Sequence, residues 1–69
     1  SNDSVLTTKI KTQMLADSGV PVSRIKVITE NGVVYLLGVV TRQEANAASN
    51  VVQSTSGVQK IIKLFQYTD

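Results

Sequence analysis

Apolar residues follow two different patterns in the middle of the chain. In residues 25–30, Ile25 and Val27 alternate with Lys26, while residues 33–40 are apolar at every position except Gly38. A period of two residues is typical of a β-strand, and a strand that is apolar on both faces usually lies in the middle of its sheet. Asn-Gly separates the two segments, and it favours a type I′ hairpin turn, which needs positive φ at both central residues. We predict an antiparallel hairpin with a central second strand.

The segment before the hairpin has a helical period. Leu6, Ile10 and Met14 recur every four residues, and this spacing places them on one face of a helix, which is predicted to pack on the sheet and support the helix from inside. We predict a helix that begins at residue 3 or 4, continues to about residue 17 and ends before Ser18-Gly19, where glycine favours a helix end. The short loop that follows contains nothing that predicts catalysis.

A second helix is predicted directly after the hairpin. Thr41 and Glu44 are three residues apart, which fits a capping box at the start of a helix. Gly57 is predicted to close this helix. The helix has a narrow face of small side chains, which allows close packing on the sheet: Ala45, Ala48, Val52 and, at the side, Val51.

A third strand is predicted at about residues 58–67. The right-handed crossover rule makes it parallel to the second strand, joined to it through the second helix, with sheet order 1-2-3. The predicted fold class is α+β, in the order αββαβ, with both helices on one face of a mixed three-stranded sheet. Residues 1–69 then form a single domain, and Gly38 inside the second strand indicates a bulge or a close approach by a neighbouring element.

Composition restricts this picture further. The chain has 69 residues, no cysteine and a net charge of +2, and its seven basic residues are spread along the sequence. The predicted surface is mildly basic without a polybasic patch, so that most lysines have no role beyond solvation. No apolar run approaches the roughly 20 residues of a membrane-spanning helix. The polar start carries no secretory signal, and we expect any export signal to lie upstream of residue 1.

The candidate chemistry favours binding over catalysis. The sequence lacks histidine and cysteine, which removes the usual zinc ligands and imidazole bases. The five acidic residues are scattered, and the four glycines do not form a phosphate-binding loop. We predict no enzyme activity, no metal site and no cofactor.

A surplus of apolar residues requires an explanation. Two helices cover one face of the sheet, and the predicted alternation directs six side chains to the other face: Ile28, Tyr35, Leu37, Val39, Ile62 and Leu64. A contiguous exposed apolar patch usually marks an interface. Alternatively, a one-residue shift of the last strand would return Ile62 and Leu64 to the core.

These motifs resemble a known family. The residues that carry the resemblance are Ile25-x-Val27, Asn31-Gly32, Val34-x-Leu36-x-Gly38-x-Val40, Glu44, Ala45, Ala48, Ser56-Gly57-Val58 and Ile61. The pattern resembles the BON domain (bacterial OsmY and nodulation) and covers almost the whole chain. Further motifs are similar to the second BON domain of dual-BON outer-membrane lipoproteins: Ser1-Asn2-Asp3, Thr7-Thr8-Lys9, Thr29-Glu30-Asn31-Gly32, Gly38 and Glu44-Ala45.

The resemblance implies a function and a location. It implies recognition of anionic phospholipid through the first helix, in a periplasmic lipoprotein of the outer membrane that supports envelope integrity. The lipid anchor and first BON domain would lie outside this fragment. The candidate lipid contacts are Val5, Leu6, Thr8, Lys9, Lys11, Thr12 and Leu15. Related domains often carry a tryptophan where this chain has Val5, so we expect weaker or more charge-dependent binding here.

Two other function classes remain. The first is a protein-interaction module that docks a companion BON domain or envelope protein through Tyr35, Leu37, Val39, Ile62 and Leu64. The second is nucleic-acid binding of the KH type, which the sequence does not favour because it lacks a GxxG loop and a basic cluster. Asn31, Gly32, Gly38 and Gly57 are predicted to have structural roles only.

Overall fold

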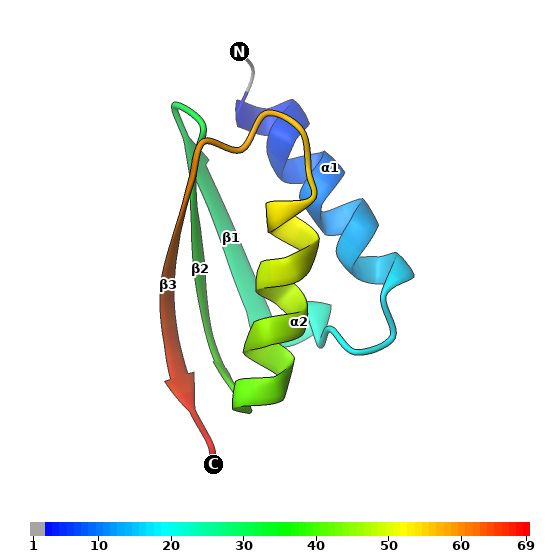
Figure 1. Ribbon diagram of the computed structural model, residues 1–69, viewed down its shortest axis with the longest axis vertical. Helices are drawn as coiled ribbons and strands as arrows, with labels where there is room; N and C mark the ends of the chain where they lie inside the picture. Colours follow the sequence, from blue (N-terminus) through cyan, green and yellow to red (C-terminus); the bar gives the residue numbers. More distant parts are fainter. Residues whose placement is uncertain (1–2) are drawn as a thin grey trace.

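The computed structural model describes residues 3–69, so Ser1 and Asn2, the start of one resembling motif, lie outside the described residues. Two helices cover one face of a three-stranded sheet (Figure 1). This arrangement confirms the predicted α+β class and the αββαβ order. The elements are α1 (Asp3–Ala16), a 3-10 turn η1 (Val22–Arg24), β1 (Ile25–Glu30), β2 (Val33–Val40), α2 (Arg42–Gln53) and β3 (Lys60–Tyr67).

The sheet has the order β1-β2-β3. β1 pairs antiparallel with β2, and β3 pairs parallel with β2 after the crossover through α2. Asn31 and Gly32 have φ of 53° and 80°, as a type I′ turn requires. The predicted hairpin, the central position of β2 and the parallel crossover are therefore all confirmed. β3 begins at Lys60, two residues later than predicted.

Gly38 lies where β1 comes close to β2. It forms the end pair of the β1–β2 register with Ile25, and it also pairs with Phe65 of β3; both registers match one residue to one residue, so there is no bulge. A Cβ atom at this position would collide with the backbone oxygen of Arg24, and the φ of +156° is rare for L residues. The close approach was the correct one of the two predicted explanations.

One apolar core lies between the helices and the sheet. From α1 it contains Leu6, Ile10 and Met14, as predicted, with exposed fractions of 6%, 0% and 0%. From α2 it contains Ala45, Ala48, Val51 and Val52, also as predicted. The remaining buried apolar residues are Val20, Ile25, Val27, Val34, Leu36 and Val40.

The two ends of α2 differ in how well the sequence predicted them. At the start, the Glu44 amide donates to Thr41 Oγ1 at 3.1 Å and the Thr41 amide donates to Glu44 Oε1 at 2.9 Å, which completes the predicted capping box. At the other end the prediction was wrong. The helix ends at Gln53 with Ser54 as its C-cap, whereas Gly57, with φ of +99°, lies in the turn beyond it.

The register of β3 decides between the two predicted alternatives. Ile61 and Phe65 pack against the core, whereas Leu64 is 53% exposed. Ile62 is opposite Tyr35, and Leu64 is opposite Leu37. Ile62 and Leu64 therefore lie on the face away from the helices, and the shifted register does not occur.

Candidate functional site

The outward side of α1 carries apolar side chains that the core does not use. Val5 is 56% exposed and Leu15 is 73% exposed. A helix turns once in about 3.6 residues, so Val5 and Leu15 share one stripe with Thr8 and Thr12, opposite buried Ile10. We call Val5, Thr8, Thr12 and Leu15 the outer stripe. α1 thus has apolar side chains on two opposite sides, and only one of them packs on the sheet.

A lysine lies on each side of the outer stripe. By the helical period, Lys9 falls on one flank and Lys11 on the other. Lys9 Nζ donates to the Ser56 carbonyl oxygen at 3.1 Å and lies 2.9 Å from Ser56 Oγ, which ties it to the segment between α2 and β3. Lys11 is exposed. The positive charge of Lys9 is therefore held in place, while that of Lys11 extends into solvent.

A shallow hollow of about 430 Å³ lies beside the stripe, and it is lined by Ser4, Val5, Thr8, Lys9, Thr12 and Gln13. The Thr8 hydroxyl donates to the Ser4 carbonyl oxygen at 2.9 Å, within the helix. Five of the seven predicted lipid contacts thus belong to the outer stripe or the hollow: Val5, Thr8, Lys9, Thr12 and Leu15. Lys11 lies on the flank.

Leu6 does not belong to this surface. It is 6% exposed and lies in the core with Ile10 and Met14. Its place among the predicted lipid contacts was wrong, because the spacing that places it on the buried face also removes it from the outward side. The prediction that it supports the helix from inside is correct.

The outer face of the sheet forms a second apolar surface. Ile28 is 42% exposed and Val39 is 51% exposed, like Leu64 beside them, while Tyr35, Leu37 and Ile62 are partly buried. The register sets Ile28, Tyr35 and Ile62 in one row across the three strands. Figure 1 shows both helices on the opposite face, so no described element covers this one.

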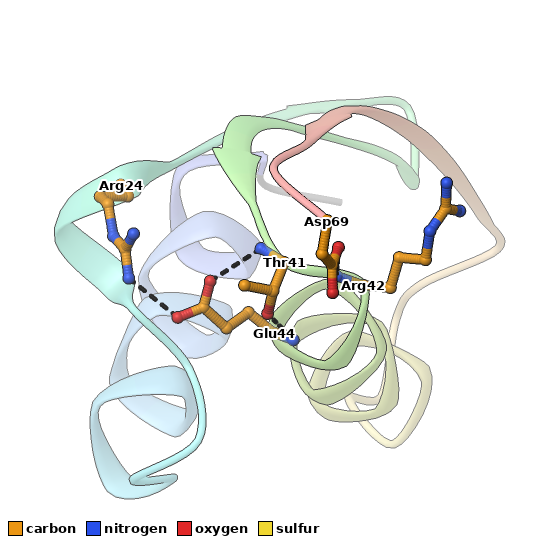
Figure 2. Close-up of polar contacts among 5 residues, drawn as sticks. All are labelled: Arg24, Thr41, Arg42, Glu44 and Asp69. Atoms are coloured by element: carbon orange, nitrogen blue, oxygen red, sulfur yellow. Dashed lines mark hydrogen bonds and ion pairs between the residues drawn. The ribbon is translucent and has the colours of Figure 1, made fainter.

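The most developed polar cluster is structural. Arg24 Nη2 is 2.8 Å from Glu44 Oε2, and this ion pair joins η1 to the capping box of α2 (Figure 2). The hydrogen bond from the Thr41 amide, with the nearby Arg24 guanidinium, holds the pKa of Glu44 below its usual value. At the same end the Asp69 carboxylate accepts from the Arg42 amide at 3.0 Å. The ion pair thus holds η1 against α2, and the Asp69 contact holds the segment after β3 against the start of the same helix.

Within residues 3–69, no group of three or more His, Cys, Asp or Glu side chains could hold a metal ion. Over the same residues, no helix is long and apolar enough to cross a membrane.

Sequence reasoning missed the contacts that hold the segment after α2 to α1. Thr55 is buried, and its hydroxyl lies 2.5 Å from Gln13 Oε1 and 2.9 Å from the Val51 carbonyl oxygen. Together with the contact between Lys9 and Ser56, this fixes the loop to the first helix. The partners lie 42 and 47 residues apart, so that no local pattern reveals them.

Comparison with known proteins identifies the family. Residues 2–69 match the model of the BON domain. The chain belongs to the BON domain family. It is 51% identical over 69 residues to outer membrane lipoprotein DolP of Haemophilus influenzae, covering 100% of this chain and 36% of that protein. It is also 46% identical over 67 residues to the 21 kDa hemolysin of Actinobacillus pleuropneumoniae, covering 97% of this chain and 34% of that protein.

A more distant relative is osmotically-inducible protein Y of Escherichia coli, which is 36% identical over 62 residues, or 88% of this chain and 31% of that protein. The chain spans about a third of the length of these curated relatives. The predicted similarity to BON-containing outer-membrane lipoproteins is therefore confirmed at the level of the sequence.

Proposed function

We propose that this BON domain binds the surface of anionic phospholipid membranes through the outer stripe of α1. We further propose that its parent protein is a periplasmic lipoprotein at the outer membrane that maintains the envelope. The location is supported by the relative of 51% identity that is named an outer membrane lipoprotein. The assignment of the lipid contact to α1 is supported by the exposed apolar side chains and the flanking lysines of this helix.

The observation that carries this proposal is the pair of exposed apolar side chains between two lysines. Val5 and Leu15 are 56% and 73% exposed, and they lie in the first and the last turn of α1. Such side chains enter the boundary between headgroups and acyl chains, while flanking ammonium groups meet lipid phosphates. Each basic residue near an anionic surface contributes about 1 kcal/mol. Two lysines and two aliphatic side chains give shallow, salt-sensitive attachment.

An NMR titration of the 15N-labelled 69-residue chain tests this surface. Phosphatidylglycerol micelles should shift the amides of residues 4–15, and shifts with zwitterionic micelles or at higher salt should be smaller. Higher salt screens the interaction between exposed charges. Shifts that are equal for both lipids, or that avoid α1, would contradict the proposal.

Two matched variants test whether the positive charge that attracts the lipid lies on α1. Lys11→Glu should weaken binding to phosphatidylglycerol vesicles several-fold, while Lys26→Glu, which makes the same charge change on β1, should have a smaller effect. If both variants weaken binding equally, the net charge of the domain is responsible and α1 is not the contact. Val5→Trp should strengthen binding, because tryptophan favours the membrane interface.

The outer sheet face supports a second candidate function, which is docking of a companion BON domain or another envelope protein. The supporting observation is the uncovered apolar surface of Tyr35, Leu37, Val39, Ile62 and Leu64, of which Val39 and Leu64 are more than half exposed. In the longer parent protein, Leu64→Glu should expose this face and increase amide exchange along β2, since a charge would replace an apolar contact. Unchanged exchange would contradict this role.

A further inference from the structure

A groove on a third surface lies between α2 and the outer edge of β3. Because the sheet order is β1-β2-β3, β3 pairs on one side only within the described residues. An edge strand offers unpaired backbone N–H and C=O groups to another strand. Figure 1 shows α2 on one face of the sheet, and residues of α2 and of β3 line this groove together.

The hydrogen-bond pattern identifies which backbone groups of β3 point outward. The amides of Lys60 and Thr68 donate to Gly32 and Val40, at 3.4 Å and 2.9 Å, so these even-numbered residues point toward β2. The pairing of β3 with β2 continues residue by residue from Lys60 to Tyr67. Since successive residues of a strand alternate in direction, the N–H and C=O groups of residues 61, 63, 65 and 67 point away from the sheet.

α2 provides a polar wall beside the first half of this edge. The groove has a volume of about 640 Å³, and Asn46, Asn50 and Gln53 from α2 line it together with Lys60, Ile61 and Lys63 from β3. Spacings of four and three residues place the three amide side chains on one stripe of the helix. Within residues 3–69 these side-chain amides make no hydrogen bond, so that they are available to a ligand in the groove.

The charge of the groove indicates the chemistry of its ligand. Lys60 and Lys63 line it, and none of its lining residues is acidic. Arg24 and Glu44 form an ion pair at the N-terminal end of α2, away from the groove. Two copies of β3 would bring lysines together with no acidic residue to offset their charge, because residues 60–67 contain none, and this disfavours pairing between copies. The groove therefore suits a different, acidic chain.

The geometry points to a binding site for an extended acidic peptide segment of another protein. The segment adds as a fourth strand beside β3, where its backbone pairs with residues 61, 63 and 65. Its side chains on the helix side contact the amides of α2, and a carboxylate on that side meets Lys63. This mode of recognition takes affinity from main-chain hydrogen bonds and specificity from side-chain contacts. The site is separate from both the outer stripe of α1 and the outer sheet face.

A designed peptide tests the site. The probe is an acetylated and amidated eight-residue peptide in which valine alternates with threonine or aspartate. In a titration of the 15N-labelled 69-residue chain, we expect saturable shifts at the amides of residues 61, 63 and 65 and at the side-chain amides of Asn46 and Asn50. The amides of residues 4–15 should remain unchanged, which separates this outcome from the fate of the proposed lipid contact.

Matched controls separate backbone pairing from charge. A peptide with lysine in place of aspartate should bind at least tenfold more weakly, as should the acidic peptide with alternate backbone amides methylated. In the protein, Lys63→Pro removes an outward N–H without removing a bond to β2, and it should abolish the shifts. Lys63→Glu should weaken binding at least tenfold if the fold measured by NMR is retained.

Three outcomes would overturn the proposal. The first is the absence of saturable shifts along β3 at millimolar acidic peptide. The second is equal binding of the acidic and lysine peptides, which would exclude recognition of charge. The third is shifts centred on Tyr35 and Leu37, which would place the peptide on the outer sheet face.

Discussion

Gly38 is the position where a single residue type decides whether the hairpin forms. Its backbone has a φ of +156°, and the space that a Cβ atom needs is filled by the carbonyl oxygen of Arg24. Any side chain must therefore push β1 away from β2 at the start of the sheet, directly after η1. The sequence indicated a close approach at this glycine, but the atom that comes close is set by the register.

Gly38→Val should destabilise the domain severely. Backbone strain costs about 1–3 kcal/mol, and overpacking costs a further 1–3 kcal/mol, as a rough estimate. A domain of this size has a total stability of only about 3–10 kcal/mol. Urea denaturation followed by circular dichroism measures the loss. Gly19→Ala is the control, since Gly19 does not have positive φ, and it should retain most of the stability. A cooperative melt of Gly38→Val at the wild-type temperature would contradict this account.

At the scale of the elements, α2 is the best-predicted helix because its start is specified locally. Thr41 and Glu44 satisfy each other's amides across three residues, and the sequence displays that spacing directly. The ion pair between Arg24 and Glu44 was not foreseen. It spans 20 residues and is largely exposed on the arginine side, so we expect it to add little to the stability of the fold.

The lowered pKa of Glu44 predicts a pH dependence of stability. Since the folded-state pKa lies below the unfolded value of about 4.3, the ionised carboxylate stabilises the fold above that value. This stabilisation is lost as the pH falls through the folded pKa. Between pH 7 and pH 3 the wild type should lose more stability than Glu44→Gln, as measured by urea midpoints. Glu30→Gln, which changes an acid outside the described ion pair, should retain the wild-type dependence.

At the scale of the whole molecule, the sheet has two apolar faces and a single layer of helices. Adjacent residues of β3 therefore have different environments. Phe65 packs against the core, while Leu64 is 53% exposed on the outer sheet face. The same asymmetry appears in α1, whose inward leucine, isoleucine and methionine are buried while Val5 and Leu15 are exposed. More apolar surface is present than one core can bury.

Phe65→Ala and Leu64→Ala should therefore differ in the isolated chain. Removal of a large aromatic side chain from a core costs about 3–5 kcal/mol, and the partly buried Phe65 should approach the lower value. Substitutions at exposed positions usually change stability by about 0.5 kcal/mol or less, and half-exposed Leu64 should remain within about 1 kcal/mol. Thermal melts of both variants measure the difference. Equal losses would contradict the difference in burial between Phe65 and Leu64.

The sequence by itself determined the features that depend on neighbouring residues. Asn31-Gly32 specified the turn, Thr41 with Glu44 specified the start of α2, and the four-residue spacing from Leu6 specified the buried face of α1. The crossover rule then left one plausible sheet order. Each of these signals works within a few residues or through a strong rule of chain handedness, which is why the fold could be predicted almost completely.

Only the tertiary structure decided the features that depend on distant residues. It tied Lys9 to Ser56, and it put the end of α2 at Gln53 before the turn containing Gly57. It also set the amide stripe of α2 beside the free edge of β3. Periodicity shows which residues share a face of one element, but which surfaces meet depends on packing between elements far apart in the sequence.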